Sequence, residues 1–339
     1  MLDLEPAKLR SRWQTLREEN PKLRIRDAAD QLDVSEAALV ALGVGETATR
    51  LQSNWTDLLF ELHRLGSVMG LTRNDHAVHE RHGNYGKLEM LGDVVIAKDG
   101  GFEAALFISR WTMGFAVSES SHGQVRKSFQ FFDEEGVAVH KIYLTEQSCS
   151  ELFEDVVTQF RSADQSDVVQ VGSRPGQKPG DDIDVLWSSR IFSDWPKSAD
   201  GRALTDPDMS LKSASVQADP LDTGSVEVVL NRAAELGTPL VVVVGNSGAV
   251  QLHRGPVQKI LRTGPWINVL DETFNLHLRD NQLAAGWRIR ELTDIGAISL
   301  CWSDGQHRPV LQIFSEDRSG SWDECVKASV NGNQRDVAA

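Results

Sequence analysis

The passage RNDHAVHERHG, residues 73–83, recurs 172 residues later as GNSGAVQLHRG, residues 245–255. Asparagine, alanine, valine and glycine keep their places in both passages. FEAALFISRWTMGFAV from Phe102 then matches FNLHLRDNQLAAGWRI from Phe274, and SFQFFDEEGVAVHKIY from Ser128 matches SLCWSDGQHRPVLQIF from Ser299, with the offset shortened by one residue. Two repeats of this length indicate a duplicated domain with a pseudo-two-fold axis rather than a solenoid of short units.

The composition of the chain fits two ordinary domains. It has 339 residues, of which 40% are apolar, enough for two buried cores. The net charge of −14 argues against nucleic acid or an anionic membrane as the main partner. No run approaches about 18 apolar residues and no signal-peptide pattern opens the chain, so we expect neither membrane insertion nor secretion. The three cysteines, Cys149, Cys301 and Cys325, show no metal or disulfide spacing, which favours a reducing cytoplasm.

Each half of the chain predicts helices followed by strands. In the first half we expect short strands between Ser67 and Leu144, with helices at 7–18, 25–32, 35–42, 54–65 and 151–161. In the second half we expect a helix at 226–236 and strands over 240–314, whereas 183–224, rich in Ser, Asp and Pro, predicts an eroded helical opening. This order, twice over, indicates the α+β class with mostly antiparallel sheets.

Domain boundaries follow from the same order. Residues 163–182 are polar and contain Gly and Pro, which predicts a linker. We therefore expect a first repeat at 1–162, a second repeat at 183–325 and a disordered tail at 326–339.

Short motifs limit the chemistry. Residues 24–45 have helix-turn-helix spacing, but the second helix carries Glu36 and no Lys or Arg, so packing helices are favoured over DNA binding. His76, His79 and His82 are spaced by three, which alternates their faces on a strand. No metal site is predicted, although a metal-dependent protein using the histidines around His79 stays an alternative. The G-x-S-x-G, P-loop and G-x-G-x-x-G motifs are absent, so the catalytic residues are unknown.

One histidine interrupts an apolar segment. GPWINVLDETFNLHL, residues 264–278, is dense in Trp, Phe and Leu and predicts a core strand. Alternation places Leu276 and Leu278 on one face and His277 on the other. His277 is therefore a satisfied pocket residue or a ligand.

Five segments of the chain resemble the cytoplasmic heme-handling proteins of bacterial heme-uptake operons, called hemin transport, hemin-degrading or heme-trafficking proteins. The segments are ENPKLRIRDAADQLDVSEAAL at 19–39, LTRNDHAVHERHGNY at 71–85, KSFQFFDEEGVAVHKIYL at 127–144, VVVVGNSGAVQLHRGPV at 241–257 and GPWINVLDETFNLHL at 264–278. The resemblance covers most of the chain outside residues 165–225 and the C-terminus. It implies a duplicated α+β fold with large stacked antiparallel sheets and a heme pocket between the halves.

The resemblance does not extend to the family's heme ligands. Family members carry a proximal histidine in a W-x-x-L-T-D-V-H helix, where the seventh residue after Trp187 is here Asp194. A distal arginine of a D-L-R-L-F strand is replaced by Ala105. A family lysine near a propionate is replaced by Glu291, beside Arg290. Aspartate is a poor heme-iron ligand compared with His, Cys, Met or Tyr.

Few residues remain that could hold heme. His79 matches a family histidine, and His277 is the internal-repeat equivalent of Ala105. The full candidate set is His79, His277, His253, Arg73 and Arg290.

We therefore predict a divergent member of this family that binds heme or a related tetrapyrrole in the cytoplasm during bacterial heme-iron uptake. It would traffic heme or help degrade it, and the replaced ligands argue against ring opening. A protein donor or acceptor of heme and a homodimer remain open. The alternative is an interaction or regulatory protein that keeps the scaffold and no longer binds heme.

Overall fold

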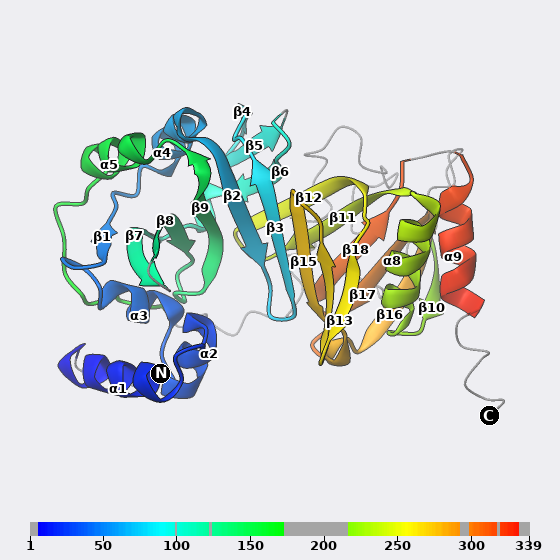
Figure 1. Ribbon diagram of the computed structural model, residues 1–339, viewed down its shortest axis with the longest axis horizontal. Coiled ribbons are helices and arrows are strands. Elements are labelled where there is room, and N and C mark those ends of the chain that lie inside the picture. Colours follow the sequence, from blue (N-terminus) through cyan, green and yellow to red (C-terminus); the bar gives the residue numbers. More distant parts are fainter. Residues whose placement is uncertain are drawn as a thin grey trace.

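Within its described residues, this α+β protein forms two large antiparallel sheets of nine strands each, as the alternating segments predict (Figure 1). The structure is a computed structural model that describes residues 6–98, 100–121, 124–172, 216–291, 298–316 and 319–331. Within these ranges no helix is long and apolar enough to cross a membrane.

Each sheet combines six strands of one half with three of the other. The first sheet has the order β1 (Ala48–Arg50), β7 (Met113–Ser121), β8 (Gln124–Phe132), β9 (Ala138–Ser148), β2 (Gly66–Arg73), β3 (Ala77–Gly83), β15 (Phe274–Arg279), β14 (Trp266–Leu270) and β13 (Ile260–Thr263). The second has β10 (Val216–Leu221), β16 (Ala285–Glu291), β17 (Ile298–Ser303), β18 (Pro309–Phe314), β11 (Pro239–Gly245), β12 (Ala249–Pro256), β6 (Glu103–Phe107), β5 (Val94–Lys98) and β4 (Lys87–Leu91). The two orders correspond strand for strand, so the halves exchange three strands within one duplicated plan.

Two asparagines join the halves at the pseudo-two-fold axis. The Asn74 amide donates to two carbonyl oxygens of the second half, those of Gly245 (3.3 Å) and Val310 (2.8 Å). Asn246, its repeat equivalent, donates to two carbonyl oxygens of the first half, one of them that of Arg73, both at 2.8 Å. Each amide oxygen accepts from two backbone N–H groups of its own half. The recurrence of asparagine in the repeated passage therefore reflects the join between the halves.

Helices cover both faces of the first sheet (Figure 1). We call its outer face the one that carries Phe115 and Lys141, where α1 (Pro6–Glu19), α2 (Ile25–Leu32) and α3 (Glu36–Ala41) lie. The inner face meets the second sheet and is covered at its far end by α4 (Trp55–Glu61) and α5 (Ser150–Gln159). On the second sheet, α8 (Ser225–Leu236) and α9 (Ser321–Asn331) repeat the positions of α4 and α5.

A buried ion pair anchors α3 to the outer face. Ser35 caps the helix, since its Oγ accepts from the Ala38 N–H at 3.1 Å. Glu36 then points into the sheet and binds the Lys141 ammonium, with both side chains less than a tenth exposed. The acidic residue that argued against DNA binding is thus used to hold the helix pair on the sheet.

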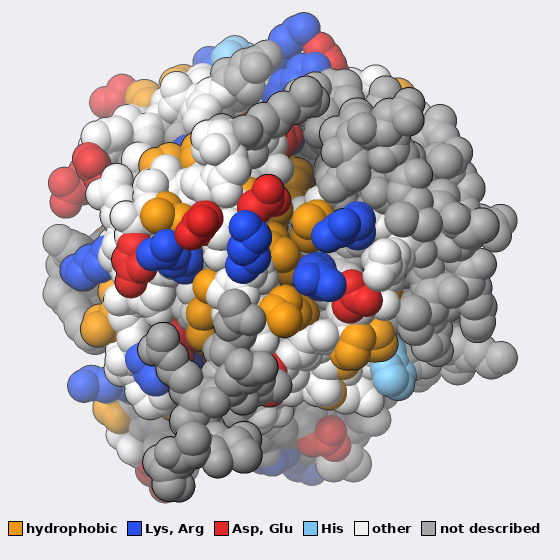
Figure 2. Space-filling model, turned by 90° about the vertical axis from the view of Figure 1, so that its right-hand side faces the viewer, with side chains coloured by type: hydrophobic (Ala, Val, Ile, Leu, Met, Phe, Trp, Pro, Cys, Tyr) orange, Lys and Arg blue, Asp and Glu red, His pale blue; other side chains and the backbone are white. Residues whose placement is uncertain are grey.

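The far end of the molecule, at α8 and α9, has a mixed surface. Basic and acidic side chains are interspersed there with apolar ones (Figure 2). Arg232 of α8 pairs with Glu235 of the same helix and with Glu324 of α9. The described residues of this face therefore show both signs of charge side by side.

The predicted boundaries change at three places. Residues 326–331 complete α9 and Val326 is buried, so the disordered tail predicted at 326–339 is wrong for its described part, because α9 packs on α8. The linker predicted at 163–182 is packed where it begins, since Arg50 donates to the carbonyl oxygens of Ser166 and Val168. Of the eroded opening predicted at 183–224, residues 183–215 lie outside the described residues, and Val216–Leu221 form β10. The repeats at 1–162 and 183–325 share their sheets rather than each closing its own.

Candidate ligand-binding site

A cleft of about 570 Å³ opens on the outer face of the first sheet. Its walls come from α2 with the loop before it and from the ends of β2, β14 and β15. We call it the α2 cleft; it is lined by Lys22, Leu23, Arg24, Arg26, Asp27, Asp30, Arg73, Asp75, His76, Trp266 and Arg279. The volume is in the range of small-molecule sites.

The floor of the α2 cleft is cationic. Arg73 and Arg279 are half-buried, and no described carboxylate forms an ion pair with either. The Arg279 Nε is buried without a hydrogen-bond partner. Burial and the neighbouring Arg26 lower the pKa of Arg73 to about 10, so it stays charged at neutral pH. Asp75, the carboxylate on the floor, is already bound by Arg26 and Arg308.

An indole sits among these cations. Trp266 of β14 is half-buried, and the guanidinium carbons of Arg24 and Arg279 lie 6.0 Å and 5.6 Å from its ring centroid. Such cation–π contacts hold guanidinium groups over an aromatic face while leaving their N–H donors available. The cleft thus offers an aromatic side chain next to anion-binding groups.

His277 adjoins the α2 cleft on the same face of the sheet. It is two residues from Arg279 on β15, and strand register aligns it with Arg73 through Val78. Its Nδ1 lies 2.7 Å from the Asn268 Oδ1. Because the Asn268 amide nitrogen donates to the Leu261 carbonyl oxygen (3.0 Å), its Oδ1 is the acceptor and His277 Nδ1 carries the proton.

This tautomer leaves the lone pair on His277 Nε2, for which no partner is seen in the described chain. Burial lowers the pKa of His277 below its ordinary value, so the ring is neutral at pH 7. A neutral imidazole whose other nitrogen is held by an oxygen is the usual form of a metal-binding histidine.

The other two predicted histidines lie in the interior between the sheets. His79 is fully buried on β3, and its Nδ1 accepts from the Gln251 Nε2 at 2.9 Å, so its Nε2 carries the proton. His253 is 4% exposed and stacks on Phe274 with ring centroids 3.9 Å apart. Burial lowers the pKa of both rings, that of His253 to about 4. The structure brings these two histidines together but closes both off from the α2 cleft.

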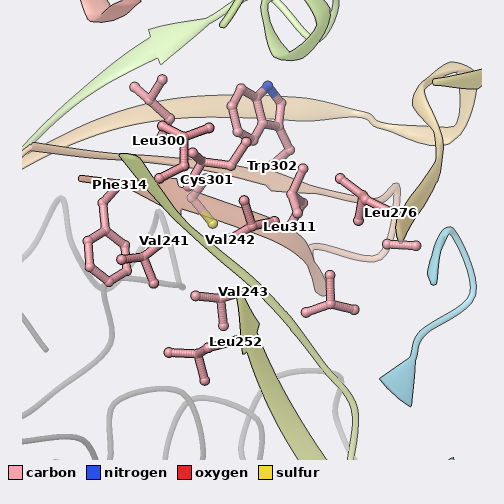
Figure 3. Packing of buried hydrophobic residues seen from close by; sticks show 14 of the residues in the cluster. Val241, Val242, Val243, Leu252, Leu276, Leu300, Cys301, Trp302, Leu311 and Phe314 are labelled. Carbon is pink, nitrogen blue, oxygen red and sulfur yellow. The ribbon is translucent and has the colours of Figure 1, made fainter. Parts of the chain in front are cut away.

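The equivalent face of the second sheet is mainly apolar around Ala105, although Gln312 and the Glu103–Arg254 ion pair also lie on it. Ala105 lies there in register with Val250, beside a row formed by Leu252, Val243, Gln312 and Cys301. Val241, Val243, Leu252 and Phe314 point to this side of the strands, and Leu300, Trp302 and Leu311 to the other (Figure 3). Gln312 is fully buried with neither amide atom bonded. Trp187 and Asp194 fall outside the described residues.

Arg290 is separate from every other candidate. It is exposed on β16 and pairs in register with Ile298, whereas Trp287 of the same strand pairs with Cys301 on the opposite face. Of the five predicted site residues, the structure therefore places only Arg73 and His277 beside one cleft.

A small acidic cluster adjoins the same cleft. The ligand atoms of Asp75, His76 and Asp304 lie within 4.8 Å of one another. Arg308 binds both carboxylates at 2.7 Å, and Arg26 also binds Asp75. Because guanidinium groups already neutralise the carboxylates, the cluster is an ion-pair network that orders the cleft wall.

Both repeats of the chain match one family model, that of the haemin-degrading HemS/ChuX domain, over residues 33–160 and 209–328. The chain belongs to this family. The hemin transport protein HmuS of Yersinia pestis is 29% identical over 357 residues, covering 98% of this chain and 99% of that protein. The predicted resemblance and the duplicated fold are thereby confirmed.

Solved structures of the family share the whole architecture. Holo-PhuS, a heme-binding protein from Pseudomonas aeruginosa, has a TM-score of 0.81 at 32% identity, over 96% of this chain and 99% of that chain. The heme degrading enzyme ChuS of Escherichia coli O157:H7 has a TM-score of 0.80 at 22% identity, over 96% and 100% of the two chains, which shows the common fold.

Sequence reasoning missed Trp266, Arg279 and Arg24 as site residues. Trp266 stood in a segment dense in apolar residues and was interpreted as core. The alternation that separated His277 from Leu276 also places Trp266, Asn268 and Arg279 on the side of His277. The same alternation, applied along β14 and β15, could have identified Trp266 and Arg279 as site residues.

Proposed function

We propose that this chain binds heme as a carrier in cytoplasmic heme-iron uptake, with the macrocycle held in the α2 cleft. His277 would supply the iron ligand, and Arg73 with Arg279 would bind the propionates. Support comes from the family, whose members include a hemin transport protein and a heme-binding protein. The carrying observation is that His277 presents an unbonded Nε2 next to half-buried arginines that lack carboxylate partners.

The spacing of these groups suits a macrocycle. Arg73 and His277 stand two strands apart in one register row, which is about 10 Å between backbones. Long arginine side chains reach inward from there and pair bidentately with carboxylates. The Trp266 indole would add apolar contact along the ring edge. The iron, the propionates and the apolar edge of heme would thus each contact a group of this chain with matching chemistry.

Carriage is favoured over ring opening. Oxidative opening of heme needs iron with an open, shielded coordination position and polar groups that steer bound dioxygen. At the position of the family's distal arginine, this chain has Ala105, which lies in an apolar row with Val250. The replacement of the proximal histidine by Asp194 stays a prediction, as do a homodimer and a protein acceptor of heme. The alternative of a scaffold that no longer binds heme rests on the same two replacements.

A hemin titration tests the proposal. We expect a saturable one-to-one complex with a Soret band in the wild-type chain, and at least tenfold weaker binding with a shifted band in His277→Ala. His79→Ala and His253→Ala serve as controls, since their rings are enclosed, and each should retain the wild-type Soret position once its fold is checked by circular dichroism. A wild-type spectrum in His277→Ala would contradict the assigned ligand, and absence of saturable binding to the wild-type chain would contradict heme carriage.

A further inference from the structure

Five cationic side chains line the α2 cleft against three carboxylates, of which Asp75 is already bound by Arg26 and Arg308, while Asp27 and Asp30 are exposed. Lys22 and Arg24 lie exposed at its mouth, and Arg73 and Arg279 lie half-buried on its floor. None of the four forms an ion pair with a described carboxylate. In a chain of net charge −14, such a group of unpaired cations is unusual. The cleft therefore has more cations than anions.

The proposed iron ligand, His277, does not line the cleft with these cations. It lies on the adjoining part of β15. A ligand seated in the cleft therefore meets Arg73, Arg279 and the Trp266 indole first, whether or not it carries a metal. Charge-assisted hydrogen bonds of the arginines to carboxylates are the strong contacts available there.

We infer that the α2 cleft recognises the dicarboxylate edge of a tetrapyrrole rather than its metal, so that it also takes iron-free dicarboxylic porphyrins. This inference rests on the proposed function for the site but extends the class of ligand beyond heme. The cations of the cleft then determine how the ligand binds, and iron coordination by His277 adds a further contact. The indole, which carries the guanidinium groups of Arg24 and Arg279 over its ring, provides apolar contact for the edge of the macrocycle beside its carboxylates.

The test uses protoporphyrin IX, its dimethyl ester and hemin with the full-length chain. Fluorescence titration should show protoporphyrin IX binding one-to-one within tenfold of hemin, and the uncharged dimethyl ester binding at least tenfold more weakly than the diacid. Arg279→Gln and Arg24→Gln should each weaken both acids by several-fold or more. His277→Ala should weaken hemin and leave protoporphyrin IX unchanged. Arg290→Gln, which alters an exposed arginine outside the cleft, is the matched control and should change nothing.

The outcomes separate this inference from the proposed function. If hemin binds through His277 but protoporphyrin IX binds more than tenfold more weakly than hemin, the inference is overturned and heme carriage stands. If the dimethyl ester binds as tightly as the diacid, the inference is overturned as well, because the carboxylates then play no part. If protoporphyrin IX binds as expected and His277→Ala leaves hemin binding unchanged, the cleft is confirmed as a dicarboxylate site and the iron ligand is wrong.

Discussion

Replacing Asn246 by alanine tests how the join between the halves shapes the α2 cleft. The side chain makes four hydrogen bonds, to the carbonyl oxygens of Arg73 and Val139 and from the N–H groups of Gly248 and Ala249. At about 0.5–1.5 kcal/mol per bond, the loss of these four bonds in Asn246→Ala should cost about 2–6 kcal/mol of stability. For a chain of this length that corresponds to a fall of roughly 3–8 °C in Tm.

The assay is thermal unfolding followed by circular dichroism, combined with hemin titration. Because Asn246 holds the carbonyl group of Arg73, the variant should also bind hemin more weakly than the wild-type chain. Asn231→Ala is the matched control, since this exposed side chain of α8 donates, within the described chain, only to the Glu227 carbonyl oxygen of the same helix. A Tm change below 1 °C in Asn246→Ala, no larger than in the control, would refute the assigned role of the asparagine pair.

Two further predictions concern buried charge. Lys141→Met alone should destabilise the fold by about 3–5 kcal/mol, because it leaves the buried Glu36 carboxylate without its ion-pair partner. In a denaturant titration, the double change with Glu36→Leu should recover most of this loss. An equal loss in the single and the double variant would count against the ion pair. Burial lowers the pKa of His140 to about 3 and that of His253 to about 4. The stability that depends on these two neutral rings is therefore fully present above about pH 6.5, and it falls at lower pH as the unfolded chain takes up protons. Between pH 7 and 4.5 the loss should be about 2–3 kcal/mol for each histidine, and His253→Gln should show a shallower fall of Tm with pH than the wild type.

Much of the fold was predictable because alternation and internal repetition are local signals. α2 (Ile25–Leu32), the Ser35 cap and the strands around Phe131 follow from residue spacing alone. The exchange of three strands between the sheets was not predictable, since it depends on pairings such as β3 with β15, nearly 200 residues apart in sequence. The histidines and the arginine of β3 look like surface residues in sequence, and the burial of His79 is decided by partners such as Gln251 from the other half.

The candidate site was also predictable in part, because local alternation shows on which face of a strand a residue lies. His277 was identified by its face relative to Leu276, and the structure keeps that relation. His79 and His253 carried the same chemistry in sequence, but the pairing of the two halves places them inside. Which histidine is open to a ligand is a property of the sheet arrangement rather than of the local sequence.

Imidazole rescue tests whether His277 Nε2 is the iron ligand beside the cationic α2 cleft. His277→Gly leaves space where the ring was, so its hemin complex should lose the wild-type Soret band and regain it when imidazole is added. His79→Gly should show no such response, because the ring it removes is enclosed between the sheets. A His277→Gly complex that has the wild-type spectrum before imidazole is added would exclude His277 as the iron ligand.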